Sequence, residues 1–241
     1  MSTAQAVAVI TGASRGIGAA LVQAFRNRNY RIVATSRSIK PCCDEDLVTV
    51  RGDIANPNTA KQVFKEALDR FGRVDTLVNN AGMFIAKSFT SYSNDDYASY
   101  ISTNVTGFFH MTQRAMELMS QEGRGHVVTV TSSLVDQPMS NVPAVLTSLT
   151  KGALNAATKS LAIEYARNGV RVNAVSAGII KTPMHPLESH PFLASLHPMG
   201  RMGEVSEIVD AILYLDSANF ITGEILHVDG GQAAGHHPIT L

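Results

Sequence analysis

Short apolar segments alternate with longer amphipathic segments along most of this chain of 241 residues. The short segments are rich in Val and Ile and are mostly continuous, which is typical of strands buried on both faces of a parallel sheet. The longer segments carry apolar positions at helical spacing. We expect strands at residues 6–10, 31–35, 48–51, 76–78, 126–130, 171–175 and 225–228, and helices at residues 16–28, 58–70, 95–120, 144–168 and 205–215.

The alternation of strands and helices continues over residues 1–241. It predicts a single doubly wound α/β domain with a parallel sheet of about seven strands and helices on both faces. Asn56 and Pro57 are suited to cap and to begin the helix predicted at residues 58–70. Ligands of such folds bind at the carboxyl edge of the sheet, where the strand order reverses. Functional residues are therefore expected in the loops that follow the strands.

One long segment, residues 182–202, has no clear helical or strand pattern. It contains Pro183, Pro186, Pro191 and Pro198, four of the nine prolines of the chain. Long irregular segments in a compact domain are usually functional lids or binding loops. We interpret residues 182–202 as a lid over the substrate.

The charge balance excludes several classes of protein. The chain has 20 Lys and Arg against 20 Asp and Glu, with no basic run, so neither nucleic acid nor an anionic membrane is expected as a partner. Its two cysteines, Cys42 and Cys43, are adjacent, which suits a reducing cytoplasm better than a disulfide framework. No signal-peptide pattern and no membrane-length apolar run occur, so a cytoplasmic location is predicted.

A glycine-rich turn follows the first predicted strand. Residues 11–18 read Thr-Gly-Ala-Ser-Arg-Gly-Ile-Gly and lead into a helix. Glycines let a backbone approach a phosphate closely, and a helix N-terminus offers free N–H groups to it. The spacing differs from that of the commoner G-x-G-x-x-G dinucleotide motif. The turn predicts a site for the phosphates of a nucleotide.

Further motifs follow this turn in order along the chain: Asn79-Asn80-Ala81-Gly82, Thr103-Asn104-Val105, Ser132, Thr150-Lys151-Gly152-Ala153-Leu154, Arg171-Val172-Asn173-Ala174-Val175, Ile221-Thr222-Gly223-Glu224 and His227-Val228-Asp229-Gly230-Gly231. Together with the turn they resemble the short-chain dehydrogenase/reductase superfamily, from residue 7 to about residue 231. The resemblance implies a Rossmann-type NAD(P)-binding domain. It also implies hydride transfer between a nicotinamide and a carbonyl or alcohol carbon.

The end of the second predicted strand bears on the choice of cofactor. Folds that prefer NAD place an acid there, to hold the ribose 2′-hydroxyl. Here Ser36 takes that place and Arg37 follows it, while Arg15 lies in the glycine-rich turn. Two guanidinium groups could clamp a 2′-phosphate, so we predict NADP(H) over NAD(H). The alternative is two solvated surface arginines.

The resemblance also assigns the rest of the cofactor site. It implies that Asp53 and Ile54 flank the adenine, that Asn80 and Gly82 line the ribose side, and that Thr182 holds the nicotinamide amide with Ile180. An Ala177-Gly178 pair stands where the family usually has Pro-Gly. The complete expected set is Gly12, Ser14, Arg15, Gly16, Ile17, Gly18, Ser36, Arg37, Asp53, Ile54, Asn80, Ala81, Gly82, Lys151, Gly178, Ile180 and Thr182.

The expected acid/base residue is missing from its motif. The family uses a tyrosine phenol in Tyr-x-x-x-Lys, but the residue four before Lys151 is Thr147, and none of the six tyrosines has a lysine four residues later. An aliphatic hydroxyl has a far higher pKa than a phenol and a shorter reach. The resemblance leaves Asn104, Ser132 and Lys151 as catalytic positions, with Thr147 in place of the tyrosine.

Another group could supply the proton. A histidine titrates near neutrality, and the candidates are His185, His190, His197, His236 and His237. Alternatively, each is an ordinary loop histidine. Tyr92, Tyr97 and Tyr100 are expected to pack or to line the rim of the pocket. No set of Cys, His and carboxylate residues shows metal-ligand spacing, so no metal is predicted.

The leading hypothesis is an NADP(H)-dependent oxidoreductase acting on a small or medium carbonyl or alcohol. The alternatives are a catalytically silent NADP(H)-binding sensor or interaction protein, and a lyase or isomerase on the same fold. The resemblance further suggests a homodimer or homotetramer paired through the helices at residues 95–120 and 144–168, or else helices that only cover the sheet. Their large apolar side chains are Phe108, Phe109, Met111, Met116, Leu118, Met119, Leu154 and Leu161.

Overall fold

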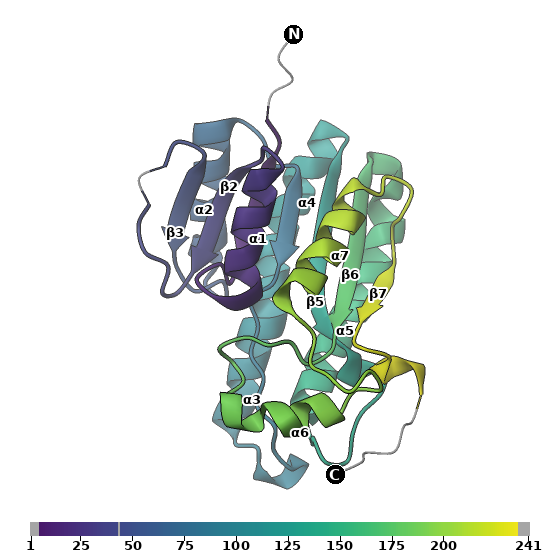
Figure 1. Cartoon of the computed structure of the whole chain (residues 1–241). Helices are drawn as coiled ribbons and strands as arrows, with labels where there is room; N and C mark the ends of the chain where they lie inside the picture. The colour runs from purple at the N-terminus through teal and green to yellow at the C-terminus, as the bar shows by residue number, and fades with distance from the viewer. Residues whose placement is uncertain (1–4, 43, 236–241) are drawn as a thin grey trace.

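The computed structural model describes residues 5–42 and 44–235, and within them seven parallel strands form one sheet. The strand order is β3-β2-β1-β4-β5-β6-β7 (Figure 1). Strands β2 and β3 are added on one side of β1 and strands β4 to β7 on the other, so the order of strand addition reverses between β1 and β4. The prediction of a doubly wound α/β domain is therefore confirmed. The strands are β1 Val7–Thr11, β2 Arg31–Ser36, β3 Leu47–Arg51, β4 Thr76–Asn79, β5 Gly125–Ser132, β6 Val170–Ala177 and β7 Ile225–Val228.

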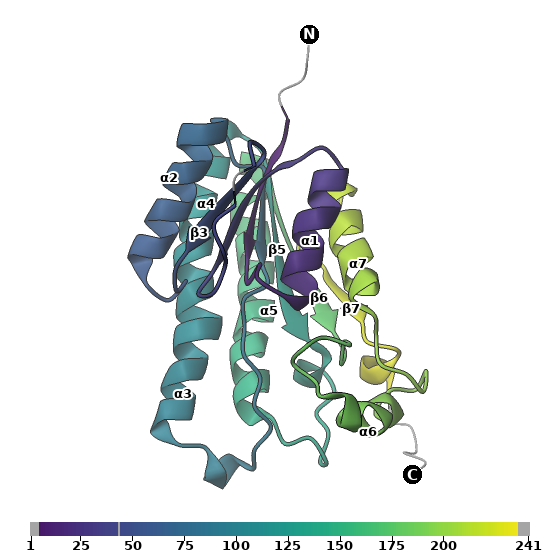
Figure 2. The same ribbon diagram turned by 60° about the vertical axis from the view of Figure 1, so that its left-hand side comes forward.

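Helices cover both faces of the sheet. Figure 2 shows α1 (Gly16–Asn27) and α7 (Val205–Ser217) on one side, and on the other α2 (Pro57–Phe71), α4 (Gly107–Glu122) and α5 (Val145–Tyr165). The two apolar layers alternate along the strands as the pleat requires. In β1, for example, Val7 and Val9 face the α2 and α4 side, whereas Ala8 and Ile10 face the α1 and α7 side.

The ends of α2 follow the sequence signals. The Asn56 side chain accepts a hydrogen bond from the backbone N–H of Asn58, and Pro57 is the first helical residue. Gly72 then ends the helix in the left-handed region, at φ 75°, which costs glycine little. The predicted cap and first position are both confirmed.

The helix predicted at residues 95–120 is divided into three parts. They are α3 (Asn94–Tyr100), a π-helical segment (Ile101–Thr106) and α4. A π-helical turn changes the hydrogen-bond pattern within an otherwise continuous helix and often marks a functional site. Figures 1 and 2 show that α3 extends beyond the carboxyl edge of the sheet.

The apolar residues named on the two long helices mostly serve the core. Met111, Met116 and Met119 are buried in the core cluster on one face of the sheet, and Leu154 is buried as well. For these four residues the structure agrees with the alternative that the helices cover the core, and pairing through α4 and α5 would have to use other side chains. Phe109, with 53% of its surface exposed, points away from the sheet.

The predicted lid is more regular than its prolines indicated. It contains a 3-10 turn (Leu187–Ser189) and a short helix, α6 (His190–Ser195), in which Pro191 is one of the first two residues. Figures 1 and 2 place α6 below the carboxyl edge of the sheet. Within residues 5–42 and 44–235, no helix combines the length and the apolar character needed to cross a membrane.

Candidate active site

A cavity of about 600 Å³ opens at the carboxyl edge of the sheet. The glycine-rich turn, the segments that follow β2 to β6, the start of α5 and the lid all contribute to its wall. The predicted cofactor residues that line it are Gly12, Ser14, Arg15, Gly16, Ile17, Ser36, Arg37, Asp53, Ile54, Asn80, Ala81, Gly82, Lys151, Gly178, Ile180 and Thr182. Only Gly18 of the predicted set is absent from this wall.

Close backbone packing joins the glycine-rich turn to the end of β4. The Asn80 side chain donates a 3.0 Å hydrogen bond to the carbonyl of Thr11, whose hydroxyl accepts from the N–H groups of Asn80 and Ala81. A Cβ on Gly12 would lie 2.9 Å from the Ala81 Cα, and one on Gly18 would lie 2.3 Å from the Gly12 carbonyl oxygen. Gly18 thus brings α1 against the turn.

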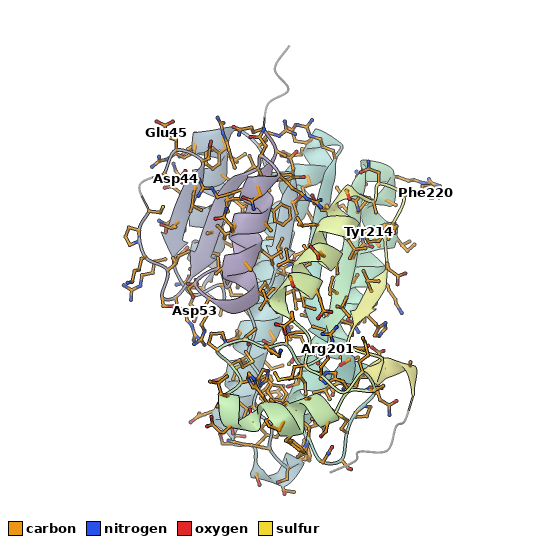
Figure 3. All side chains as sticks on the ribbon, viewed as in Figure 1. Asp44, Glu45, Asp53, Arg201, Tyr214 and Phe220 are labelled. Atoms are coloured by element: carbon orange, nitrogen blue, oxygen red, sulfur yellow. The ribbon has the colours of Figure 1, made fainter. Side chains whose placement is uncertain are left out.

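Two arginines flank the cavity near the end of β2. Arg15 and Arg37 are exposed, and neither forms an ion pair with any other described residue. The backbone carbonyl of Arg37 accepts a 2.9 Å hydrogen bond from the side chain of Arg51, which fixes this part of the loop. Asp53 is exposed just beyond β3, at the lower edge of the sheet in Figure 3. The free guanidinium groups and the helix N-terminus provide the chemistry that phosphate groups require.

Lys151 lies deep in the cavity wall. Its ammonium nitrogen donates a 2.7 Å hydrogen bond to the carbonyl of Val130, and burial lowers its pKa to about 8. Gly82 faces it so closely that a Cβ there would lie 3.0 Å from Nζ of Lys151 and 3.3 Å from Oδ1 of Asn104. A side chain at position 82 would press on Lys151 and Asn104, so the glycine there lets both side chains lie close to the segment that follows β4.

Asn104 is buried in the π-helical segment and does not line the cavity. Its Oδ1 accepts a 3.0 Å hydrogen bond from the Met83 backbone N–H, and its Nδ2 donates a 3.0 Å hydrogen bond to the hydroxyl of Thr150. Asn104 thus connects the loop after β4 to α5. In this structure its amide positions other residues of the site.

Two hydroxyl groups lie in the wall near Lys151. Ser132, at the end of β5, is half-buried, and its Oγ accepts a 3.3 Å hydrogen bond from the Leu134 N–H. Thr147, one helical turn before Lys151, has its Oγ1 3.0 Å from the phenol oxygen of Tyr100. Both residues of this pair are buried.

Sequence reasoning placed Tyr100 among packing residues and missed its bond to Thr147. The two positions are 47 residues apart, so no local spacing pattern connects them. One signal was present, since Tyr100 precedes the expected site residue Asn104 by four positions, the spacing that places side chains on one helical face. Tyr97 is exposed and does not line the cavity.

The candidate histidines differ in their surroundings. His185 lines the cavity, and its pKa is lowered by burial and then by the neighbouring His190. His197 is buried, with Nε2 3.0 Å from the Ile179 N–H and Nδ1 3.1 Å from the Leu193 carbonyl, so it connects the lid to the end of β6. His236 and His237 lie outside the described residues.

Several large apolar side chains contribute to the cavity wall. Met184, Phe192 and Leu193 come from the predicted lid, whereas Met83 and Phe84, in the loop after β4, were not identified from the sequence.

Gln232 lies in the same wall and is only 2% exposed. Neither polar atom of its amide makes a hydrogen bond with another described residue. A buried polar group without a partner is costly, so this amide is suited to contact a ligand. In the part of the chain that the structure describes, no three His, Cys, Asp or Glu side chains are grouped to hold a metal ion.

The sequence resembles those of known reductases over nearly its whole length. The family model for enoyl-(acyl carrier protein) reductase matches residues 12–233. The 3-oxoacyl-(acyl-carrier-protein) reductase FabG of Buchnera aphidicola is 34% identical over 244 residues, which cover 96% of this chain and 99% of that protein. A 3alpha-hydroxysteroid dehydrogenase of Mediterraneibacter gnavus is 35% identical over 245 residues, which cover 93% of this chain and 95% of that protein.

Solved structures with the same fold include cofactor complexes. The structure of ElxO with NADP bound has a TM-score of 0.90 and 28% identity, and the match covers 96% of this chain and 100% of that chain. The 3-ketoacyl-(acyl-carrier-protein) reductase of Brucella melitensis, complexed with NADH, has a TM-score of 0.86 and 27% identity, with the same coverage.

Proposed function

The chain belongs to the short-chain dehydrogenase/reductase family of oxidoreductases, and on that premise we propose that it transfers a hydride between NADP(H) and a small or medium carbonyl or alcohol. The observation that carries this proposal is one continuous cavity in which the glycine-rich turn, Ser132 and Lys151 meet. When bound there, the nicotinamide supplies or accepts the hydride. The Ser132 hydroxyl holds the substrate oxygen, and Lys151 lies on the cofactor side of the cavity.

The preference for NADP(H) over NAD(H) is supported by the charges around the end of β2. Arg15 and Arg37 both line the cavity and are free to bind the 2′-phosphate that distinguishes the two cofactors. ElxO has NADP bound, whereas the Brucella melitensis enzyme is complexed with NADH. Because these neighbours bind different cofactors, the preference proposed for this chain is based on its two arginines.

The substrate class is supported by the lid and by the relatives. Apolar side chains such as Met83, Phe84 and Phe192 contribute to the cavity wall, and the relatives named above act on 3-oxoacyl groups or on hydroxysteroids. We infer a ketone or secondary alcohol attached to an apolar body. The acid/base group is altered, with Thr147 four residues before Lys151.

The experiment is a substrate screen on the purified protein. NADPH and then NADH are supplied with acetoacetyl-CoA or a 3-oxosteroid, and the loss of reduced-nicotinamide absorbance is followed. Oxidation of NADPH by at least one carbonyl is the expected result. Tight NADPH binding without turnover would instead identify a silent binding protein, and conversion of a probe without NADPH oxidation would identify a lyase or isomerase. Both alternatives follow from Thr147, which stands where the family has its acid/base tyrosine.

We also propose that two copies pair through α4 and α5. Phe109, Leu149 and Ile163 are large apolar residues on these helices, and their exposed fractions are 53%, 52% and 82%. Light scattering of the wild type and of an Ile163→Glu variant tests this. A dimer or tetramer that dissociates in the variant is expected, and a monomeric wild type would contradict the proposal.

A further inference from the structure

Two hydroxyl groups form a chain that leads from the core to the cavity. Tyr100 is completely buried and does not line the cavity, whereas Thr147 does line it. Their oxygens are 3.0 Å apart. Thr147 Oγ1 has no second hydrogen-bond partner among the described residues. The Thr147 hydroxyl therefore stands between the phenol and the space where a substrate binds.

The surroundings of Tyr100 direct its proton toward Thr147. The Ile85 N–H donates a 2.5 Å hydrogen bond to the phenol oxygen. The Ile85 carbonyl oxygen accepts a 2.7 Å hydrogen bond from Tyr92 and a longer one, at 3.2 Å, from the Tyr100 phenol. Thr147 Oγ1, at 3.0 Å, is the nearer of the two acceptors for the Tyr100 proton. The hydrogen on Thr147 is then free to point into the cavity.

The Ile85 N–H has a second effect. It supplies a hydrogen bond to the negative charge that develops on the phenol oxygen during proton transfer. The edge-to-face contact of the Tyr92 and Tyr100 rings, with centroids 6.3 Å apart, holds both phenols around Ile85. These contacts hold the Tyr100 hydroxyl beside Thr147, although Tyr100 itself cannot touch a substrate.

We propose that Tyr100 is the proton reservoir of the reaction and that Thr147 relays its proton to the substrate. This rests on the proposed function. As a hydride from NADPH forms the new C–H bond, the substrate oxygen takes the proton of Thr147, and Thr147 takes the proton of Tyr100. The products are the alcohol, NADP⁺ and a Tyr100 phenolate. After the alcohol leaves, water in the open cavity returns one proton through Thr147, so the net reaction consumes NADPH, the carbonyl compound and one proton.

This arrangement answers the objection to threonine as an acid. An isolated aliphatic hydroxyl gives up its proton far less readily than a phenol, whose pKa is about 10. In the relay Thr147 gains one proton as it loses another, so it never carries a negative charge. Tyr100 carries the charge, and Thr147 supplies the reach.

The test is a double-mutant cycle with the best carbonyl from the screen and saturating NADPH. It compares the wild type with Tyr100→Phe, Thr147→Val and the double variant, and it includes Thr147→Ser, which keeps the hydroxyl. Tyr97→Phe is the matched control, because Tyr97 lies on the same helix, 52% exposed and outside the cavity wall. Thermal midpoint and NADPH affinity are measured for every variant.

Tyr100→Phe is expected to lower kcat by about 100-fold, as loss of general acid catalysis does, with KM and NADPH affinity changed by less than about two-fold. The solvent deuterium isotope effect on kcat should fall with it. Thr147→Val should lose as much, the double variant no more than either single one, and Thr147→Ser should retain most of the activity.

Three results would overturn the relay. They are an unchanged kcat in Tyr100→Phe, additive losses in the double variant, and a loss in Tyr100→Phe that follows the thermal midpoint or NADPH affinity. In each case an active wild type leaves the proposed function standing. If none of the carbonyl compounds in the screen supports NADPH oxidation by the wild type, the proposed function and the relay are both contradicted.

Discussion

The ammonium nitrogen of Lys151 donates a 2.7 Å hydrogen bond to the carbonyl of Val130, and no carboxylate pairs with it among the described residues. Burial lowers its pKa from 10.5 to about 8. Burying this positive charge without a carboxylate partner costs free energy. Residues at functional sites often have pKa values shifted in this way.

The lowered pKa of Lys151 predicts a dependence of stability on pH. Between about pH 8 and 10.5 the unfolded chain keeps the lysine proton and the folded chain loses it, so the free energy of unfolding should rise with pH in that window. Urea denaturation of the wild type and of Lys151→Met, compared from pH 8 upward, measures this contribution. The difference between the two curves should change in the wild type's favour as pH rises, and parallel curves would contradict the prediction.

Thr147→Tyr restores the Tyr-x-x-x-Lys spacing to the site. The cavity of about 600 Å³ has room for the ring, and a phenol beside Lys151 can donate a proton directly. We expect kcat for carbonyl reduction to rise about 10-fold or more, within the usual range for an added general acid. Thr147→Phe, which adds the ring without the hydroxyl, is the control. A loss of activity in both variants would mean that Thr147 itself serves the chemistry.

Much of the fold was predictable because its signals are local. A few neighbouring residues are enough to specify each of these features. Examples are the apolar runs of β1 and β2, the Asn56 cap of α2 and the glycine-rich turn. Those signals located the carboxyl edge of the sheet, and with it the cofactor part of the cavity.

The substrate part of the site was less predictable, because it depends on contacts between distant segments. The Tyr100–Thr147 hydrogen bond joins α3 to α5. Neither a tyrosine at position 100 nor a threonine at position 147 indicates in the sequence that the two side chains meet. The π-helical segment at Ile101–Thr106 has no period that distinguishes it from an α-helix in sequence. α6 is only six residues long, so its formation depends on packing rather than on its own pattern.

Arg15 and Arg37 are predicted to discriminate between the two nicotinamide cofactors. Removing either guanidinium, as Arg15→Ala or Arg37→Ala, should raise the Kd for NADPH by about 10- to 100-fold, the loss expected for hydrogen bonds to a charged group. The Kd for NADH should hardly change. Fluorescence titration measures both constants, and Lys40→Ala is a control for nearby positive charge. Equal losses for both cofactors would show that the arginines do not read the 2′-phosphate.

Gln232 is predicted to contact the substrate. Gln232→Leu keeps similar bulk and removes an amide that is 2% exposed and has no partner among the described residues. The free protein should become no less stable, because an unsatisfied buried amide is lost. KM for the carbonyl substrate should rise about 10-fold while KM for NADPH stays constant, since a site that loses one hydrogen bond to its ligand loses roughly that much affinity. An unchanged KM for the carbonyl would show that the amide does not contact the substrate.

His126 is predicted to limit stability in mild acid. Its ring is buried, with Nδ1 3.2 Å from the Asp216 carboxylate and Nε2 3.2 Å from the Asn173 amide nitrogen, and both contacts suit a neutral ring with the proton on Nδ1. Burial lowers the pKa of His126 below 6.5, whereas in the unfolded chain the ring binds a proton as pH falls through that value. The free energy of unfolding should therefore fall as pH drops below 6.5. His126→Gln can still donate to Asp216 and should show a flatter pH dependence in urea denaturation. If its curve falls as steeply as that of the wild type, the acid sensitivity arises elsewhere.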